Sequence, residues 1–249
     1  MSNMNGKKAK IFVGTSGWHY KHWVGTFYPT GYKPTLFMDY YLKYFNTVEI
    51  NNSFYRLPAP ETFEQWGQSV PKDFLFIVKA SRFITHNKKL LDPETSLQKF
   101  LGNVESLKKK LGPILFQLPP TWKVNRQRFE EFLKALPKKH RYVFEFRNPT
   151  WYEDGIYSLM EKYNICFCIY ELNGHLSPEV VTANFVYVRL HGPGAKYQGS
   201  YDDTMLEIWA SKIRKWKEEG KDVFCYFDND EQGYAAFNAI RIKELIGLT

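Results

Sequence analysis

Eight short apolar runs recur along this chain, and nearly every one is followed by a segment with helical periodicity. The runs resemble β-strands and cover residues 11–18, 47–55, 74–82, 112–119, 141–151, 165–172, 185–192 and 222–230. The expected helices are 34–45, 59–70, 97–111, 125–136, 156–163, 203–219 and 234–246. Strands that alternate with helices favour a parallel sheet. Eight such units in 249 residues predict an α/β fold, a single-domain (β/α)8 barrel of the TIM type.

The connection between the sixth and seventh strands is the irregular part of the predicted barrel, because residues 173–184 have room for only a turn or so of helix. A doubly wound open sheet has the same alternation, but no Gly-x-Gly-x-x-Gly sequence follows the first strand. No linker rich in Pro, Gly or Ser divides the chain. We therefore expect a flexible N-terminal segment at 1–10 and one domain at 11–249.

The composition favours a cytoplasmic protein with no membrane partner. No apolar run is long enough to span a bilayer, and the polar N-terminus lacks the apolar middle of a signal peptide. Cys166, Cys168 and Cys225 lie in predicted strands without zinc-site spacing, so we expect reduced core thiols.

The net charge of +8 and the pI near 9.2 permit attraction to phosphates. Basic residues cluster at 7–10, 108–110, 138–141 and 212–221. Most of these clusters fit solvated helix surfaces and turns, so charge alone makes nucleic acid a candidate partner and no more.

The fifth predicted strand carries two charges between apolar residues. Side chains alternate between the faces of a strand, so Glu145 and Arg147 share one face with Val143, while Phe144 and Phe146 lie on the other. A charge inside a buried strand is costly unless it is paired. The two charges therefore indicate either a structural ion pair or part of a functional site.

In nearly all of the predicted strands the apolar residues come first and the polar residues last. The strand ends carry Ser16, Glu49, Asn51, Ser53, Lys79, Ser81, Gln117, Glu145, Arg147, Tyr170, Arg189, His191, Tyr226 and Asp228. In a barrel these ends form the rim where functional groups collect. The carboxylates and cations could cancel as ion pairs, but His191, Gln117, Asn51 and Arg82 add further donors, which favours an anionic ligand.

Several motifs of the chain resemble the YecE-like proteins, the domain-of-unknown-function family 72. They begin with Gly14-Thr-Ser-Gly-Trp18, Val48-Glu-Ile-Asn51 and Ser53-Phe-Tyr55, and continue with Lys79, Thr85-His86, Phe116-Gln-Leu-Pro-Pro120, Glu145-Phe-Arg147 and Tyr187-Val-Arg-Leu-His-Gly192. The resemblance covers residues 11 to about 247 and implies a TIM-type barrel with a pocket at one end. The last strand departs from the family pattern, since Asp228 stands where an amide is usual.

The strand ends suggest an uncharacterised barrel protein that binds or acts on a phosphate-containing ligand, a nucleotide, phosphosugar or nucleic acid, by acid/base chemistry. The candidate catalytic residues are Glu49, Glu145, Lys79 and His191. The candidate ligand-binding residues are Trp18, Asn51, Tyr55, Arg82, His86, Gln117, Arg147, Trp151, Arg189, Asp228 and Asn229. We expect no cofactor and no metal, because only His191 and His86 fall near the rim and carboxylates are few. If the protein is an enzyme, a hydrolase or isomerase-like activity is expected.

Three alternatives stay open. Glu49 and Glu145 could form the carboxylate pair of a glycoside hydrolase. Lys79 could act as a Schiff-base nucleophile, although an ion pair is the plainer expectation for a buried lysine. The barrel could also be a binding module without catalysis.

Overall fold

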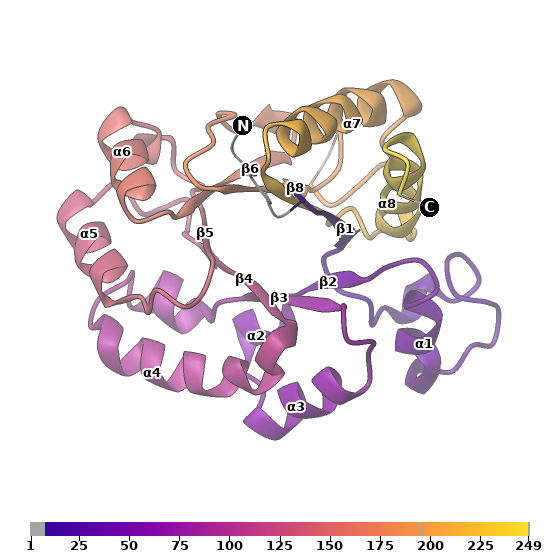
Figure 1. Cartoon of the computed structure of the whole chain (residues 1–249). Coiled ribbons are helices and arrows are strands. Elements are labelled where there is room, and N and C mark those ends of the chain that lie inside the picture. Colours follow the sequence, from indigo (N-terminus) through magenta and orange to yellow (C-terminus); the bar gives the residue numbers. More distant parts are fainter. Residues whose placement is uncertain (1–7, 195, 249) are drawn as a thin grey trace, which may run out of the picture.

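The computed structural model describes residues 8–194 and 196–248, and its strands form a ring enclosed by helices (Figure 1). The strands are β1 Ile11–Thr15, β2 Thr47–Ile50, β3 Leu75–Lys79, β4 Leu111–Gln117, β5 Tyr142–Glu145, β6 Cys166–Leu172, β7 His175–Leu176, β8 Phe185–Leu190 and β9 Asp222–Phe227. The helices outside the ring are α1 Phe37–Tyr41, α2 Asn52–Tyr55, α3 Pro60–Gln68, α4 Pro93–Val104, α5 Arg126–Ala135, α6 Asp154–Lys162, α7 Asp203–Glu218 and α8 Tyr234–Leu245.

The ring is a nearly closed parallel barrel, which confirms the predicted fold. Hydrogen-bonded neighbours follow the order β1-β9-β8-β6-β5-β4-β3-β2, and β7 pairs with β6 off this path. The seam between β1 and β2 has one isolated bridge, Ser16 to Glu49, and the amide of Gly17 donates to the Glu49 carbonyl at 2.8 Å. Gly14 permits this approach, because a Cβ on it would lie 2.5 Å from the Thr47 carbonyl oxygen.

Alternation along the strands divides the core into two layers. The smaller layer fills the barrel and is made of Phe12, Ile77, Leu115, Val143, Cys166, Cys168, Tyr170, Phe185, Tyr187, Phe224 and Tyr226. The larger layer lies between the strands and the helices and includes Phe144 and Phe146. The predicted faces of the fifth strand are therefore confirmed. Cys166, Cys168 and Cys225 are buried free thiols, also as expected.

The connection between β6 and β8 differs from the sequence prediction, because it contains no helical turn. Its chain folds back as β7 and then runs beside β6. There Thr182 Oγ1 accepts from the Phe167 amide at 2.9 Å, and Ser177 Oγ accepts from the Tyr170 amide at 2.9 Å. Hydroxyl groups thus satisfy β6 backbone donors beside its ladder with β8. The connection is irregular as predicted, but it contains the short antiparallel strand β7 in place of a helical turn.

Several predicted strands are too long at their C-terminal ends. The second ends at Ile50 and is followed by α2, and the third ends at Lys79, a few residues before a π-helix at Phe83–Asn87. The first predicted helix is a 3-10 turn, Pro34–Leu36, followed by α1. Residues 1–7 of the predicted flexible segment lie outside the described residues.

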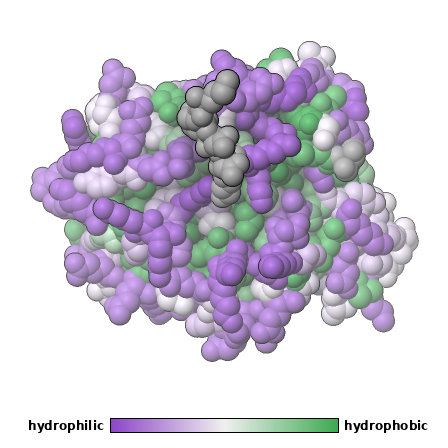
Figure 2. All heavy atoms as spheres, viewed as in Figure 1, coloured by the Kyte–Doolittle hydropathy of each residue, from purple (hydrophilic) through white to green (hydrophobic). Residues whose placement is uncertain are grey.

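Seen from the side used for Figure 1, hydrophilic side chains cover most of the surface, and hydrophobic atoms show between them near the middle (Figure 2). None of the helices in the described ranges is long and apolar enough to cross a membrane.

Candidate functional site

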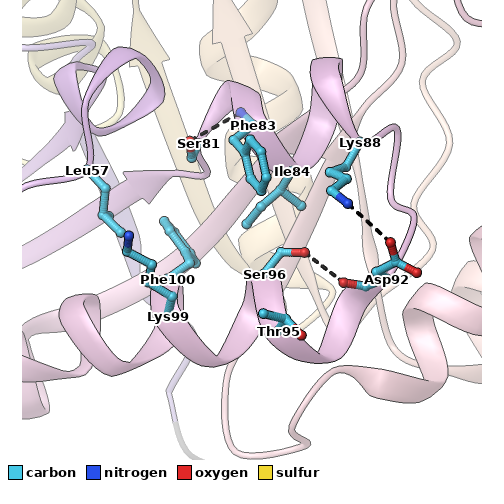
Figure 3. Close-up of a pocket in the computed structure, with 10 residues that line it drawn as sticks. All are labelled: Leu57, Ser81, Phe83, Ile84, Lys88, Asp92, Thr95, Ser96, Lys99 and Phe100. Carbon is cyan, nitrogen blue, oxygen red and sulfur yellow. Dashed lines mark hydrogen bonds and ion pairs between the residues drawn. The ribbon is translucent and has the colours of Figure 1, made fainter.

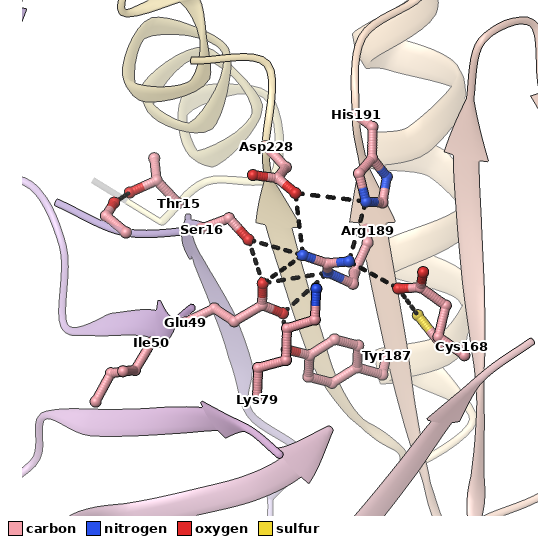
Figure 4. Close-up of polar contacts among 12 residues, drawn as sticks. Thr15, Ser16, Glu49, Ile50, Lys79, Cys168, Tyr187, Arg189, His191 and Asp228 are labelled. Carbon is pink, nitrogen blue, oxygen red and sulfur yellow. Dashed lines mark hydrogen bonds and ion pairs between the residues drawn. The ribbon is translucent and has the colours of Figure 1, made fainter. Parts of the chain in front are cut away.

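The ends of the barrel strands bring a charged cluster together around Arg189 (Figure 4). Glu49 comes from the middle of β2, Lys79 ends β3, and Arg189 lies near the end of β8. Asp228 follows β9 directly. Arg189 is 1% exposed, so its positive charge is almost entirely removed from water.

Three carboxylates surround the guanidinium of Arg189. Its Nε and Nη2 donate to the two oxygens of Glu49 at 3.0 and 2.7 Å. Its Nη1 donates to Glu145 Oε2 at 2.8 Å, and Nη2 also reaches Asp228 Oδ2 at 3.0 Å. Carboxylates on every edge of a buried guanidinium satisfy its donors and offset the cost of burying it.

Glu49 is saturated with donors. Besides Arg189, it accepts hydrogen bonds from the hydroxyl of Ser16 and from Tyr187 Oη, the latter at 2.6 Å. Its side chain is fully buried. Glu49 is therefore held in one position.

Glu145 is held in a similar way, by Arg147 Nε and by Arg189. Burial raises the pKa of its carboxyl, but Arg147 and Arg189 outweigh burial and lower that pKa well below its usual range. The charge of Glu145 is thus already neutralised by its two neighbours.

His191 follows β8 and is neutral. Its Nδ1 lies 3.1 Å from the Glu171 carbonyl oxygen, which can only accept, so Nδ1 carries the proton. Nε2 then accepts from Arg147 Nη2 and Arg189 Nη1, each at 3.0 Å. Burial and the two arginines lower the pKa of His191 well below its usual value. His191 therefore supplies no positive charge for an anion.

Lys79 is a cation of the cluster that forms no direct ion pair within the described chain, although Glu145, Glu49 and Asp228 lie close enough to raise its pKa against the effect of burial. Its Nζ lies 4.5 Å from the centre of the Phe54 ring, and no carboxylate oxygen of residues 8–194 or 196–248 forms an ion pair with it. The ion pair expected for this lysine is thus not formed. Burial, reinforced by Arg189, lowers the pKa of Lys79 to about 8.

Asp228 also titrates near neutral pH. Burial raises the pKa of its carboxyl to about 7, Arg189 opposes the shift, and Glu49 adds to it. The mouth of the barrel therefore holds one amine and one carboxyl whose pKa values lie close to each other.

Other predicted residues lie at the rim of this mouth. Arg147 extends from the end of β5 with its guanidinium 4.5 Å from the centre of the Tyr170 ring. Asn51 Oδ1 is buried and has no hydrogen-bond partner among the described residues. Tyr55 is 75% exposed, and Gln117 ends β4 beside Glu145 in the strand register.

The π-helix after β3 contributes to the same rim. Arg82 precedes it, and His86 lies within it with its ring 5.0 Å from that of Phe54. Burial, Lys79 and Arg82 lower the pKa of His86 to about 4. His86 is therefore uncharged at neutral pH.

Three predicted ligand-binding residues do not join the cluster. Trp18 packs edge-on against Trp66 of α3 at 5.6 Å, in the layer between strands and helices. Trp151 is fully buried and stacks on Phe146 at 4.9 Å. Asn229 donates to the Gly199 carbonyl and to Asn238, so it ties the end of β9 to neighbouring segments.

Ser16 stood among the polar strand ends but not among the candidate site residues, and Tyr187 and Tyr197 were not predicted. Ser16 and Tyr187 both bind Glu49, and Tyr187 lies two residues before Arg189 on the same face of β8, so strand alternation could have found it. Tyr197 packs its ring 5.6 Å from that of His191, and burial with Asp228 raises its pKa to about 12. Tyr197 belongs to a loop, where no periodicity indicates direction.

In the described part of the chain, no group of three or more His, Cys, Asp or Glu side chains has the geometry to hold a metal ion. The donor set at the mouth consists of cations, hydroxyls and carboxylates that already bind arginine.

A nearly closed α/β barrel with a charged cluster at the C-terminal ends of its strands defines the class of this protein. The chain belongs to the family described as Protein of unknown function DUF72, whose model matches residues 12–249. Among its relatives, the UPF0759 protein YunF of Bacillus subtilis strain 168 is 26% identical, over 96% of this chain and 95% of YunF. The UPF0759 protein YecE of Escherichia coli K12 is 28% identical over 58% of this chain and 51% of YecE.

Solved structures of the same family have the same architecture. A DUF72 protein from Thermotoga maritima MSB8 is 28% identical with a TM-score of 0.86, over 96% of this chain and 99% of that one. A DUF72 protein from Enterococcus faecalis V583 is 20% identical with a TM-score of 0.81, over 96% of each chain, which is a likeness of fold alone.

Proposed function

We propose that the mouth of the barrel binds a small phosphate-containing ligand and acts on it by acid/base chemistry. The observation that carries this proposal is Lys79, a largely buried amine without a carboxylate partner in the described residues. Burying a cation that forms no direct ion pair is costly, and an anionic ligand in contact with it would offset that cost.

The surrounding charges direct a phosphate toward Lys79 and Arg147 and away from Arg189. Arg189 is enclosed by Glu49, Glu145 and Asp228 and has no face left for a ligand. Arg147 uses Nε for Glu145 and Nη2 for His191, and it lies nearer the surface. Arg147 and Lys79 both act electrostatically on the carboxyl of Glu145, and a guanidinium and an amine near one point suit the charge of a phosphate group.

Proton transfer is assigned to Asp228 and Lys79. Glu49 and Glu145 were the expected bases, but their oxygens already accept several charge-assisted hydrogen bonds. A general base works best when its pKa lies near the operating pH, which fits Asp228 at about 7. In this assignment Glu49 and Glu145 are positioning residues that fix Arg189.

The glycoside-hydrolase alternative is less well supported by this arrangement. A hydrolase of that class needs the scissile bond between its two carboxyl groups. Here the guanidinium of Arg189 occupies the space between Glu49 and Glu145 and binds both of them.

The buried free thiols suit a reducing compartment, which supports the proposed cytoplasmic location.

A screen of phosphorylated metabolites, nucleotides and oligonucleotides by thermal shift tests the proposal, because a ligand that binds only the folded state raises the melting temperature. Lys79→Met and Arg147→Ala are expected to abolish the shift of a true ligand while circular dichroism stays unchanged. Lys109→Met, which changes an exposed lysine far from the mouth in sequence and fold, is the matched control. An undiminished shift in both mouth variants would refute the site.

The pH dependence of binding gives a second test. Because Lys79 loses its proton as the pH rises through about 8, phosphate affinity is expected to fall above that pH. Calorimetry across this range should show the decrease in wild type, and Lys79→Arg, which stays charged, should shift the decrease to higher pH. Binding whose affinity instead falls steeply with salt would indicate a nucleic acid.

A further inference from the structure

A cavity of about 520 Å³ lies outside the barrel, between the π-helix Phe83–Asn87 and α4 (Figure 3). Its lining consists of Leu57, Ser81, Phe83, Ile84, Lys88, Asp92, Thr95, Ser96, Lys99 and Phe100. Small-molecule sites typically enclose about 300–1,000 Å³ and are mostly apolar with a few polar groups. The cavity has this size, and Leu57, Phe83, Ile84 and Phe100 form its apolar part beside polar and charged lining residues.

The charged side chains of the cavity lie at its two ends (Figure 3). At one end Lys88 Nζ forms an ion pair with Asp92 Oδ2 at 3.1 Å, and Ser96 Oγ donates to the Asp92 carbonyl at 2.8 Å. The side chain of Lys99 lies at the other end, near Leu57, and makes no ion pair with the described residues (Figure 3). The lining therefore carries one positive charge more than Asp92 neutralises.

The backbone around this cavity is in costly conformations. A π-helix is rare and often marks a functional site. Just after it, Lys89, Leu90 and Asp92 have φ values of 48°, 65° and 48°, in the left-handed region that non-glycine residues avoid. Leu90 is 1% exposed and anchors the turn in the core. Such conformations cost about 1–3 kcal/mol each and tend to persist at ligand sites.

The entrance is also apolar. Phe83 lines the cavity and is 50% exposed. Its half-exposed ring leaves apolar surface at the cavity that the apolar part of a ligand could cover.

We propose that this cavity is a second binding site, for a small amphiphilic anion whose short acyl chain or ring enters between Phe83, Ile84 and Phe100 and whose acidic group meets Lys99. The anionic end follows from the unpaired lysine, and the apolar body follows from the wall. The site is separate from the phosphate site proposed at the barrel mouth, and its test does not depend on that site.

Fluorescence of 1-anilinonaphthalene-8-sulfonate tests this site, because the probe has apolar rings and one sulfonate. We expect saturable binding to the full chain, displaced by octanoate and not by octylamine or inorganic phosphate. Lys99→Glu should weaken octanoate at least tenfold, and Lys109→Glu, the same change on an exposed lysine elsewhere, should leave it unchanged. Ser96→Phe, which fills the cavity, should abolish binding.

Two results would overturn the proposal. The first is octanoate affinity that neither Lys99→Glu nor Ser96→Phe reduces, and the second is octylamine competing as well as octanoate. Lys99 is exposed, so Lys99→Glu keeps the test decisive even if Ser96→Phe fails to fold. Loss of phosphate binding in Lys79→Met with intact octanoate binding would separate this site from the mouth.

Discussion

At the barrel mouth, a few charged residues are required by their ion-pair partners and not by the packing of the core. Arg189 is buried among Glu49, Glu145 and Asp228, and each of these side chains depends on the others for its charge partner. Strand alternation predicted that they face one another. It could not predict which cation lacks a partner, because alternation gives the face of a side chain and not its distances.

Replacing Arg189 tests this dependence. Arg189→Met should lower the free energy of unfolding by about 3–5 kcal/mol, because three buried carboxylates lose their common donor. Urea denaturation measures the change. Arg241→Met, which removes an exposed ion pair with Asp203, should have little effect. A small loss for Arg189→Met would mean that water or local rearrangement replaces the network.

His86 makes stability depend on pH. Its folded pKa is about 4, against an ordinary value of 6.5, so the unfolded chain binds a proton that the folded chain excludes between these values. Stability is therefore expected to decrease as the pH falls from about 6.5 toward 4. His86→Gln should flatten the curve of unfolding free energy against pH in this window, while other titrating groups contribute equally to both proteins. Parallel curves would contradict the lowered pKa.

At the scale of elements, the strands were predicted well at their N-terminal ends and poorly at their C-terminal ends. The third predicted strand ran to residue 82, but β3 stops at Lys79, and its last contact is the Ala80 amide to the Leu115 carbonyl at 2.8 Å. Residues 80–82 follow the ladder as Ala, Ser and Arg, and no sequence period marks the point where pairing with β4 ends. The same ambiguity concealed the π-helix, since no period of the sequence distinguishes it from a loop.

The turn after the π-helix offers a test at this scale. Lys89 has φ of 48°, where glycine is at no disadvantage, so Lys89→Gly should raise the free energy of unfolding by about 0.5–1 kcal/mol. Lys123, an exposed residue outside the left-handed region, is the control, and Lys123→Gly should be neutral or destabilising. Thermal denaturation compares the two. A loss of stability in Lys89→Gly would mean that the side chain outweighs the backbone strain.

For the whole molecule, the alternation of strands and helices was enough to predict the barrel. The position of the irregular link between β6 and β8 was predicted, but its structure was not. Hydroxyls such as Thr182 Oγ1 bind the backbone of β6, and composition does not reveal such contacts. Closure of the ring depends on Gly14, whose absent side chain admits the Thr47 carbonyl. A glycine within an apolar run does not by itself indicate that its backbone contacts a neighbouring strand.

Substitutions at two glycines distinguish the close contact at the β1–β2 seam from the general effect of glycine on backbone entropy. Gly14→Ala should lower the free energy of unfolding by about 1–3 kcal/mol, because its Cβ would lie 2.5 Å from a backbone oxygen across the seam. Gly102→Ala should raise it by up to about 1 kcal/mol, since Gly102 is inside α4 with nothing within 4 Å of an added Cβ. Chemical denaturation of both variants checks the contrast. A tolerated Gly14→Ala would show that the seam can widen.

The seam between β1 and β2 links the shape of the molecule to its chemistry. Ser16 and Glu49 join these strands, and the same Glu49 holds Arg189. A motion that parts the two strands would break the contacts of Ser16 with Glu49 and with Arg189, so the ring and its charged centre are coupled through Ser16. A ligand that binds the charged cluster would then also hold β1 against β2. Its binding would slow deuterium uptake at the amide of Gly17, which donates across the seam.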